Sequence, residues 1–188
     1  DAMKNANKIG YPILVKAASG GGGKGMKIIK SSDDLKNAMN LAKLEAKKAF
    51  DDDKIYLEKY LEEPHHVEVQ IFSDNHGNII SLGERECSIQ RRYQKIIEET
   101  PSPFINSKLR KKLSEAAIRI TRACQYSGAG TIEFLVDKSM NYYFLEMNTR
   151  LQVEHPITEM TTGLDLVKEQ IRVASKEKLS FTQKEIQI

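Results

Sequence analysis

The spacing of hydrophobic and polar residues changes several times along the chain, and each change predicts a new element. In the first third, short apolar runs predict strands at residues 13–16, 27–29 and 55–60. Between the last two, the capping segment 31–34 opens a helix whose apolar residues recur at helical spacing. Its inward face consists of Leu35, Ala38, Met39, Ala42, Ala46 and Ala49. The pattern predicts a small α+β unit that ends near Tyr60.

Strict alternation begins after this unit. Residues 65–73 predict a strand, the turn 74–77 reverses the chain, and residues 79–82 predict the return strand. One face of the first strand carries His66, Glu68, Gln70 and Phe72. Such a face is usually solvated, and a ligand-binding role for His66 stays open beside that reading. Residues 90–95 and 98–103 read as irregular, so Arg91, Arg92 and Lys95 fit either a solvated loop or an anion-binding wall.

Two further helices are predicted at residues 107–126 and 164–175, with strands at 129–136 and 142–148 around a turn at 138–141. If Ser139 and Met140 form a two-residue tip, Glu133 lies directly opposite Glu146. Like charges repel in that position, so the fold tolerates them best with a cation between them. Two acids that face solvent are the alternative reading.

The glycine-rich segment 17–26 joins two predicted strands. Because glycine has no Cβ, backbone N–H groups in such a loop can approach phosphate oxygens closely. Lys16, at the end of the entering strand, can place its ammonium group on the same phosphates. The P-loop and dinucleotide fingerprints both fail here, because a strand follows the glycines instead of a helix. A hairpin tip without a ligand remains the alternative.

Residues 144–159 carry the densest chemistry in the chain. Glu146 and Asn148 share one strand face and offer hard oxygen ligands suited to Mg²⁺ or Mn²⁺. Arg150 is a planar cation that can hold a small oxyanion by two hydrogen bonds. Glu154 adds a carboxylate that could act as a base, or could pair with Arg150 as a structural ion pair. Together these groups predict a loop that activates phosphate or carboxylate.

Composition narrows the class of protein without naming a function. The 188 residues carry a net charge of +3, too small to indicate nucleic acid as a partner, and contain no apolar run long enough to span a membrane. Cys87 and Cys124 are too few for a disulfide framework and lack metal-ligand spacing, which favours reduced thiols in an intracellular protein. The first ten residues read as the middle of a helix, so we expect a piece of a longer protein.

Four motifs together resemble biotin carboxylase, the ATP-grasp component of biotin-dependent acyl-CoA and pyruvate carboxylases. They are residues 19–26 (SGGGGKGM), 58–61 (EKYL), 84–95 (ERECSIQRRYQK) and 146–156 (EMNTRLQVEHP). The resemblance implies an α+β ATP-grasp fold, with a lid subdomain at residues 1–60 and an incomplete catalytic domain at 61–188. It also implies ATP-dependent carboxylation of biotin by bicarbonate through carboxyphosphate.

The resemblance further implies a role for each residue that matches a motif. Lys16 and the amides of Gly22 and Gly23 would hold phosphates. Nucleotide contacts would come from Met26, Glu58, Lys59, Tyr60, Leu61, His66 and Gln90, with Tyr93 standing where related bacterial enzymes often have His. Mg²⁺ or Mn²⁺ would bind Glu133, Glu146 and Asn148. Bicarbonate would meet Lys95, Arg150, Gln152 and Val153, with Glu154 as its base.

The implied partners are a biotinylated carrier domain and a carboxyltransferase component, within an oligomeric parent enzyme in the cytoplasm or the mitochondrial matrix. The family's amino-terminal and carboxy-terminal parts are missing, so we expect weak Mg-ATP binding and little turnover from the isolated chain. Two alternatives remain open. One is a nucleotide-binding module without turnover; the other is a different ATP-grasp ligase, such as a carbamoyl-phosphate synthetase, which residues 152–156 disfavour.

Overall fold

The structure is a computed structural model that describes residues 2–19 and 26–186. The chain divides into two compact units. The first comprises residues 1–63 together with 91–94, and the second comprises residues 64–90 and 95–188. Within the described residues, no helix combines the length and apolar character needed to cross a membrane.

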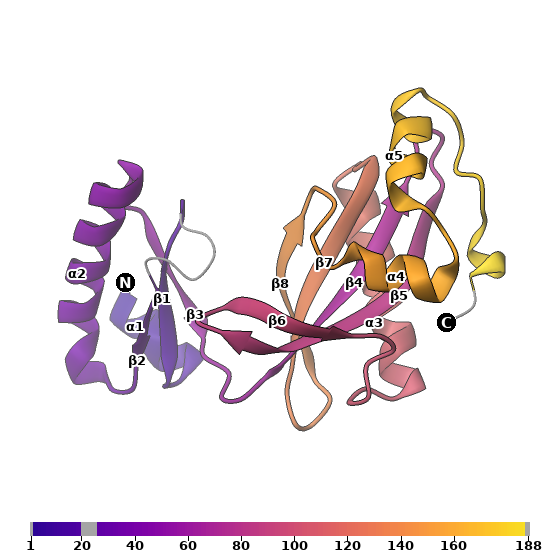
Figure 1. Ribbon diagram of the computed structural model, residues 1–188. Coiled ribbons are helices and arrows are strands. Elements are labelled where there is room, and N and C mark those ends of the chain that lie inside the picture. Colours follow the sequence, from indigo (N-terminus) through magenta and orange to yellow (C-terminus); the bar gives the residue numbers. More distant parts are fainter. Residues whose placement is uncertain (1, 20–25, 187–188) are drawn as a thin grey trace. The chain divides into compact units, whose positions relative to one another are not determined.

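The first unit is a three-stranded antiparallel sheet with two helices (Figure 1). Its elements are α1 (Ala2–Ile9), β1 (Ile13–Ala17), β2 (Met26–Ile29), α2 (Ser32–Phe50) and β3 (Ile55–Lys59), with β1 at the centre of the sheet. Ile13 and Val15 of β1 pack with Leu35 and Ala42 of α2, as the predicted inward face of the helix requires. Ala49, predicted to face inward, is exposed at the end of α2.

The second unit is a five-stranded antiparallel sheet in the order β6-β5-β4-β7-β8, with three helices (Figure 1). The strands are β4 (His65–Ser73), β5 (Ile79–Arg91), β6 (Gln94–Glu99), β7 (Gly128–Val136) and β8 (Tyr142–Asn148). The helices are α3 (Ser107–Ala123), α4 (His155–Thr162) and α5 (Leu166–Ala174), and a short 3-10 helix, η1 (Gln183–Glu185), lies near the end. The fold therefore has the predicted α+β composition.

The two faces of the five-stranded sheet have different characters. Helix α3 covers one face, where Leu109 and Leu113 pack against Val67, Val69 and Ile132. On the opposite face, Phe72 joins a second cluster with Leu166 of α5. Beyond Phe72 the same face turns polar, but Glu68 and Gln70 are fully buried. The usual solvated reading of this face is therefore wrong, because neighbouring polar groups cover it.

A β-bulge in β5 changes which of its residues reach the polar face. Val69 pairs with Glu84 and Ile71 pairs with Ser81, so β5 holds one extra residue between these pairs. Gly83 lies in this stretch with φ of 87°, a conformation that glycine adopts without steric cost. Before the bulge, Ser81 points to α3 and bonds Ser114 there. After it, Glu84 points to α3, and Arg85 faces the polar side.

The pair Glu133 and Glu146 is in register, as predicted, but for a different reason. The turn spans one more residue than a two-residue tip, because Asp137 and Asn141 close it through a 3.0 Å backbone hydrogen bond. Farther along the hairpin, Phe134 pairs with Phe144 but Glu133 pairs with Glu146. Leu145 is therefore an extra residue in β8. The two irregularities cancel, so the expected pair forms.

Two segments differ from the sequence prediction. Residues 90–95 are not an irregular loop but the tip of a β5–β6 hairpin, where Arg92 and Tyr93 adopt positive φ angles of 51° and 67°. Such a pair of left-handed residues matches the twist of a tight hairpin. Residues 155–162 form helix α4 instead of continuing the loop, with Glu154 at its N-cap. The proline at position 156 suits the first turn of this helix.

Candidate functional site

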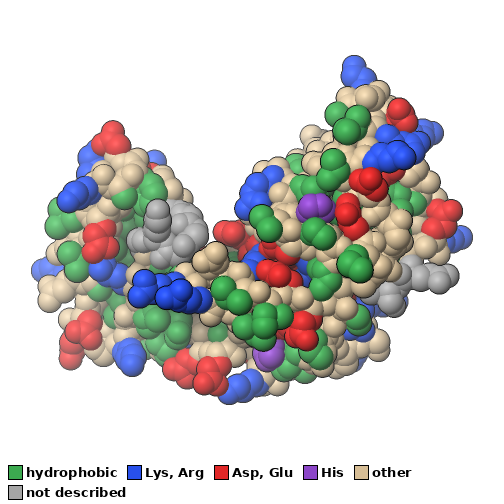
Figure 2. All heavy atoms as spheres, viewed as in Figure 1, with side chains coloured by type: hydrophobic (Ala, Val, Ile, Leu, Met, Phe, Trp, Pro, Cys, Tyr) green, Lys and Arg blue, Asp and Glu red, His purple; other side chains and the backbone are tan. Residues whose placement is uncertain are grey.

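Four charged residues form one row across the polar face of the sheet. Arg85 of β5 pairs with Glu68 of β4, Glu68 with Glu133 of β7, and Glu133 with Glu146 of β8. Three carboxylates thus stand on adjacent strands, one of them beside a guanidinium group. Figure 2 shows acidic and basic side chains gathered together on the second unit. Such a concentration of acids requires cations, and the structure supplies one from β6.

The Lys95 ammonium group joins three of the carboxylates around it. Nζ lies 2.9 Å from Oε1 of Glu133 and 2.6 Å from Oε1 of Glu154, and it also contacts Oε2 of Glu68. Lys95 therefore links β6 to β4, to β7 and to the N-cap of α4. The solvated-loop reading therefore does not hold for Lys95, because its ammonium group lies inside a charged cluster, whereas its role towards an anion stays a prediction.

These contacts shift three pKa values. Burial by itself would lower the pKa of Lys95, but the carboxylates of Glu68, Glu133 and Glu154 outweigh it and raise that pKa. Burial opposes ionisation of Glu133, yet His66 and Lys95 lower its pKa to about 2. Burial likewise works against a lowered pKa for Glu154, and the bond from Lys95 overcomes it. All three groups are therefore charged at neutral pH.

Arg85 is fully buried, and each of its N–H groups has an acceptor. Nε donates to Glu68 at 2.6 Å. Nη1 donates to Gln70 at 2.7 Å and to Thr158 at 2.9 Å, and Nη2 donates to Thr131 at 3.2 Å and to Gln152 at 3.3 Å. The side chain thus ties three strands to the segment that carries Glu154.

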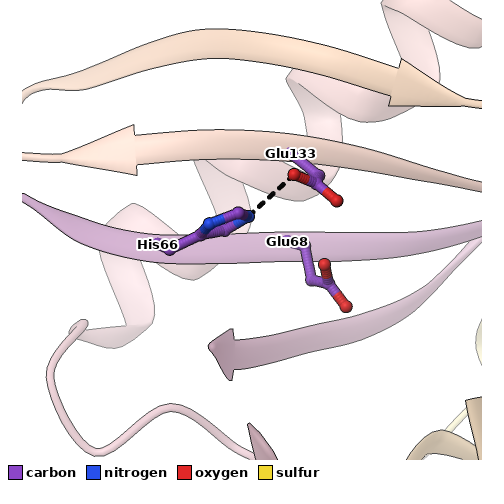
Figure 3. A group of neighbouring side chains, drawn as sticks. All are labelled: His66, Glu68 and Glu133. Carbon is purple, nitrogen blue, oxygen red and sulfur yellow. Dashed lines mark ion pairs between the residues drawn. The ribbon is translucent and has the colours of Figure 1, made fainter. Parts of the chain in front are cut away.

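His66 projects from β4 beside Glu133, on the same face as Glu68 (Figure 3). Its Nδ1 lies 2.9 Å from Nε2 of Gln90, and that amide nitrogen also donates to the carbonyl of Cys87 at 2.7 Å. A carbonyl oxygen only accepts hydrogen bonds, so the nitrogen at Gln90 Nε2 is the donor in the bond to Cys87. Its second N–H then points at Nδ1 of His66, which makes Nδ1 the acceptor. The neutral ring then carries its hydrogen on Nε2, which lies 2.8 Å from Oε2 of Glu133.

This tautomer decides which groups are suited to a metal ion. His66, Glu68 and Glu133 lie close enough to share an ion. However, a protonated Nε2 cannot ligate, and Glu68 already binds Arg85 through one oxygen and Lys95 through the other. Nε2 of His66 is buried and has no aligned hydrogen-bond partner among the described residues, although it is close to Glu133. The trio is therefore better described as a polar cluster in which His66 lies against Glu133 and Glu68 holds Arg85 and Lys95.

The predicted metal ligands Glu133, Glu146 and Asn148 are a different set of oxygen donors, in which both oxygens of Glu133 already face protein groups. Nδ2 of Asn148 donates to Oε1 of Glu133 at 2.9 Å, a bond that does not use the side-chain oxygen of Asn148. Glu146 is exposed, and no described residue forms a hydrogen bond or ion pair with its carboxylate. Carboxylate and amide oxygens are the donors that Mg²⁺ and Mn²⁺ prefer.

The bicarbonate-side candidates divide into two groups. Glu154 and Gln152 belong to the cluster, and Nε2 of Gln152 donates to Oε1 of Glu133 at 3.0 Å. Arg150 and Val153 are exposed, and Arg150 donates only to the carbonyl of Leu151 among the described residues. Arg150 and Glu154 therefore do not form the structural ion pair that was the alternative for Glu154, which pairs with Lys95 instead.

Among the candidates in the first unit, Lys16 and Glu58 lie together, with 2.5 Å between Nζ and Oε2. Nζ of Lys59 caps the carbonyls of Gly10 and Tyr11 at 2.8 and 3.2 Å. Met26, Tyr60 and Leu61 are partly buried, whereas Tyr93 at the hairpin tip is exposed. Gly22 and Gly23 lie outside the described residues. His66 and Gln90, two predicted nucleotide contacts from the second unit, lie in contact with each other.

Sequence reasoning assigned no role to Arg85, Glu68, Gln70 or Thr158. Two signals could have found the first two. The even-numbered positions 66, 68 and 70 of strand 65–73 are polar and lead to the apolar Phe72 on the same face, and the run Glu84–Glu86 interrupts an apolar strand with three charges. Nothing local marks Thr158, because its partner lies 73 residues away.

An antiparallel sheet with this buried charged row, in one chain with two strands joined by a glycine-rich segment, defines an ATP-grasp domain. The chain belongs to the family described as "Carbamoyl-phosphate synthase L chain, ATP binding domain", whose family model matches residues 1–182. Within that family its ATP-grasp domain is of the biotin carboxylase type, as its similarity to biotin-dependent carboxylases shows.

Three relatives illustrate this similarity. The chain is 56% identical over 183 residues to the mitochondrial methylcrotonoyl-CoA carboxylase alpha subunit of Mus musculus, a match that covers 97% of this chain and 26% of that protein. It is 50% identical over 188 residues to biotin carboxylase 1 of Bacillus subtilis, covering 100% and 42%. It is 52% identical over 188 residues to the propionyl-CoA carboxylase alpha chain of Ruegeria pomeroyi, covering 100% and 28%. The chain therefore spans only about a quarter to two fifths of the length of these proteins.

Solved structures agree with this assignment. A biotin carboxylase of Campylobacter jejuni, in a β,γ-ATP complex, matches with a TM-score of 0.95 and 49% identity over all of this chain and 42% of that one. The biotin carboxylase domain dimer of Hydrogenobacter thermophilus 2-oxoglutarate carboxylase, with MgADP, ADP and bicarbonate, matches with a TM-score of 0.94 and 46% identity. That match covers 100% of this chain and 41% of the other.

Proposed function

We propose that this chain supplies the ATP, metal and bicarbonate groups for ATP-dependent carboxylation of biotin. The observation that carries the proposal is the contact of Lys95 with both Glu133 and Glu154. It places a cation and an ionised carboxylate beside the Glu133–Glu146 pair, the donor set suited to a divalent ion. Nucleotide-bound relatives support the same reading, since one was solved with MgADP and bicarbonate.

In this proposal, Glu154 accepts the proton of bicarbonate. An oxygen of the resulting carbonate attacks the γ-phosphorus of ATP, a new O–P bond forms, and the bond to the leaving oxygen of ADP breaks to give carboxyphosphate. Lys95 lies next to Glu154 and balances negative charge at the reacting groups. Arg150, Gln152 and Val153 hold the bicarbonate, and Lys16 with the glycine loop holds phosphates. Mg²⁺ or Mn²⁺ on Glu133, Glu146 and Asn148 would neutralise phosphate charge.

The partners follow from the same proposal. Carboxylated biotin must be carried elsewhere, so we propose a biotinylated carrier domain and a carboxyltransferase component as partners of an oligomeric enzyme. The relatives named above are named for different carboxylases, and their shared match to this chain favours no single acceptor. We propose a cytoplasmic or mitochondrial-matrix location, as the name of the mouse relative includes the latter organelle.

The test is bicarbonate-dependent ATP hydrolysis by the protein expressed from its complete reading frame, with and without free biotin. We expect hydrolysis to require bicarbonate and to rise with biotin. Glu154→Gln is expected to lower it by roughly 10²- to 10⁴-fold, the usual contribution of a general base, while ATP affinity stays near normal. Glu115→Gln, at an exposed position of α3, is the control. Hydrolysis that depends on ammonia or ignores bicarbonate would contradict the proposal.

A further inference from the structure

Arg85 has an unusual position for a charged residue. It stands in the middle of β5 with no solvent exposure, and Glu68 is the only charged group among its five described partners. Taking a guanidinium group out of water is costly, and well-packed apolar residues often stabilise a fold at least as well. Stability alone is therefore a weak explanation for this residue.

Two of its partners lie on either side of Glu154 in the sequence. Arg85 donates to Oε1 of Gln152, two residues before Glu154, and to Oγ1 of Thr158, within the helix that Glu154 caps. Holding a segment at both sides fixes the backbone between the two points. Because Glu154 is the N-cap of α4, the position of its carboxylate depends on how α4 is held against the sheet.

The contact with Gln152 also sets the orientation of its amide. Since Oε1 of Gln152 accepts from Arg85, the amide nitrogen points the other way and donates to Oε1 of Glu133 at 3.0 Å. A third route runs through Glu68, which binds Arg85 with one oxygen and Lys95 with the other, and Lys95 in turn holds Glu154. All three routes converge on the groups assigned to bicarbonate and metal.

We propose that Arg85 is a positioning residue that holds Gln152 and Glu154 in the geometry needed for bicarbonate activation, and this rests on the proposed function. Arg85 touches no reacting group itself. Its guanidinium group also lowers the pKa of Glu154, after the larger effects of burial and Lys95. Replacing Arg85 is therefore expected to raise the KM for bicarbonate more than the KM for ATP.

The experiment compares Arg85→Lys and Thr158→Val with Arg110→Met in the protein from its complete reading frame. Arg110 of α3 pairs with Glu84 on the other side of the same strand, so its loss removes a partly exposed arginine–glutamate pair away from the site. Arg85→Lys keeps the charge but cannot make five directed bonds, and Thr158→Val removes one acceptor with little change in shape. Both are milder than a change to an apolar residue, which would leave Glu68 without its guanidinium partner.

Two readouts are measured: amide hydrogen exchange of residues 152–158, and the KM values for bicarbonate and ATP. Both site variants are expected to exchange faster in that segment than Arg110→Met, since local opening needs fewer broken contacts. The KM for bicarbonate is expected to rise on the order of 10-fold or more in Arg85→Lys, because misplacement of reacting groups by 1 Å can cost about 10²-fold. The KM for ATP is expected to change by less than about twofold, because Arg85 touches no nucleotide-side group.

Unchanged exchange in residues 152–158 would overturn the role of Arg85, whatever the activity. Faster exchange spread evenly over the whole sheet, with the ratio of the two KM values unchanged, would overturn it as well, because that is a purely structural effect. Faster exchange confined to this segment in a protein without bicarbonate-dependent hydrolysis would support Arg85 as the holder of the segment. That last result would reject the proposed function separately.

Discussion

Glu133 and Glu146 lie directly opposite each other on β7 and β8, yet their surroundings differ sharply. Glu133 is buried and accepts hydrogen bonds from Lys95, Asn148 and Gln152, whereas Glu146 is exposed without a partner among the described residues. The protein thus surrounds one carboxylate of the pair with hydrogen-bond donors and leaves the other without them among the described residues.

Glu146→Gln is therefore expected to remove metal binding without harming the fold. Repulsion between the two carboxylates disappears, so the free energy of unfolding stays equal or rises by up to about 1 kcal/mol. Titration with Mn²⁺ in the presence of ADP, followed by electron paramagnetic resonance, measures the binding. Glu115→Gln on α3 is the control for the loss of one surface charge. Unchanged Mn²⁺ affinity in Glu146→Gln would rule out this ligand set.

Lys95→Met is expected to change the pH dependence of bicarbonate-dependent hydrolysis. Burial opposes ionisation of Glu154, and Lys95 is the main group that lowers the pKa of this carboxyl. Without Lys95 that pKa rises, so Glu154 becomes protonated at a higher pH and the acid limb of the pH–rate profile moves upward in pH. Residual activity is measured across the acid range beside Lys108→Met, an exposed lysine of α3. An acid limb that stays in place would show that Glu154 is not the titrating base.

Glu133 is expected to make the fold sensitive to acid. Its pKa falls from the usual 4.5 to about 2 in the folded chain, so its ionised form stabilises the fold above pH 4.5. That contribution is lost as the pH falls from 4.5 towards 2, because the unfolded chain then binds the proton more readily. Urea unfolding across the acid range is expected to give a smaller drop in unfolding free energy for Glu133→Gln than for the unmodified protein. Equal drops would contradict the assignment.

Arg150→Ala is expected to weaken bicarbonate binding more than ATP binding. The side chain is exposed and bonds only to the neighbouring carbonyl of Leu151 among the described residues, so its guanidinium group is available to an anion. For the same reason the melting temperature is expected to stay within about 2 °C, as surface changes rarely matter more. The KM values for bicarbonate and ATP are compared with those of Arg119→Ala, an exposed arginine of α3. Equal effects on both KM values would reject a specific role.

Much of this site follows from local sequence. The strand that ends in Asn148 and the opposing strand with Glu133 were both predictable, because alternation of apolar and polar residues needs no information from elsewhere in the chain. The candidate metal ligands and the carboxylate of Glu154 could be named for the same reason. Helix α4 could not be predicted from its short and weakly periodic sequence, and the hairpin of β5 and β6 depends on two left-handed residues that are not glycine.

Only the tertiary structure decided how the charges are arranged. By simple alternation, Arg85 would share a face with Ser81 and point towards α3; the bulge at Gly83 turns it to the polar side. Likewise, Lys95 contacts three carboxylates that come from three separate segments, and the residues next to Lys95 in the sequence do not predict these contacts. The sequence by itself therefore determined the elements and the kinds of chemistry. Long-range pairing and one extra residue in a strand decided which charges meet, because ion pairs form between groups that are close in space and not in sequence.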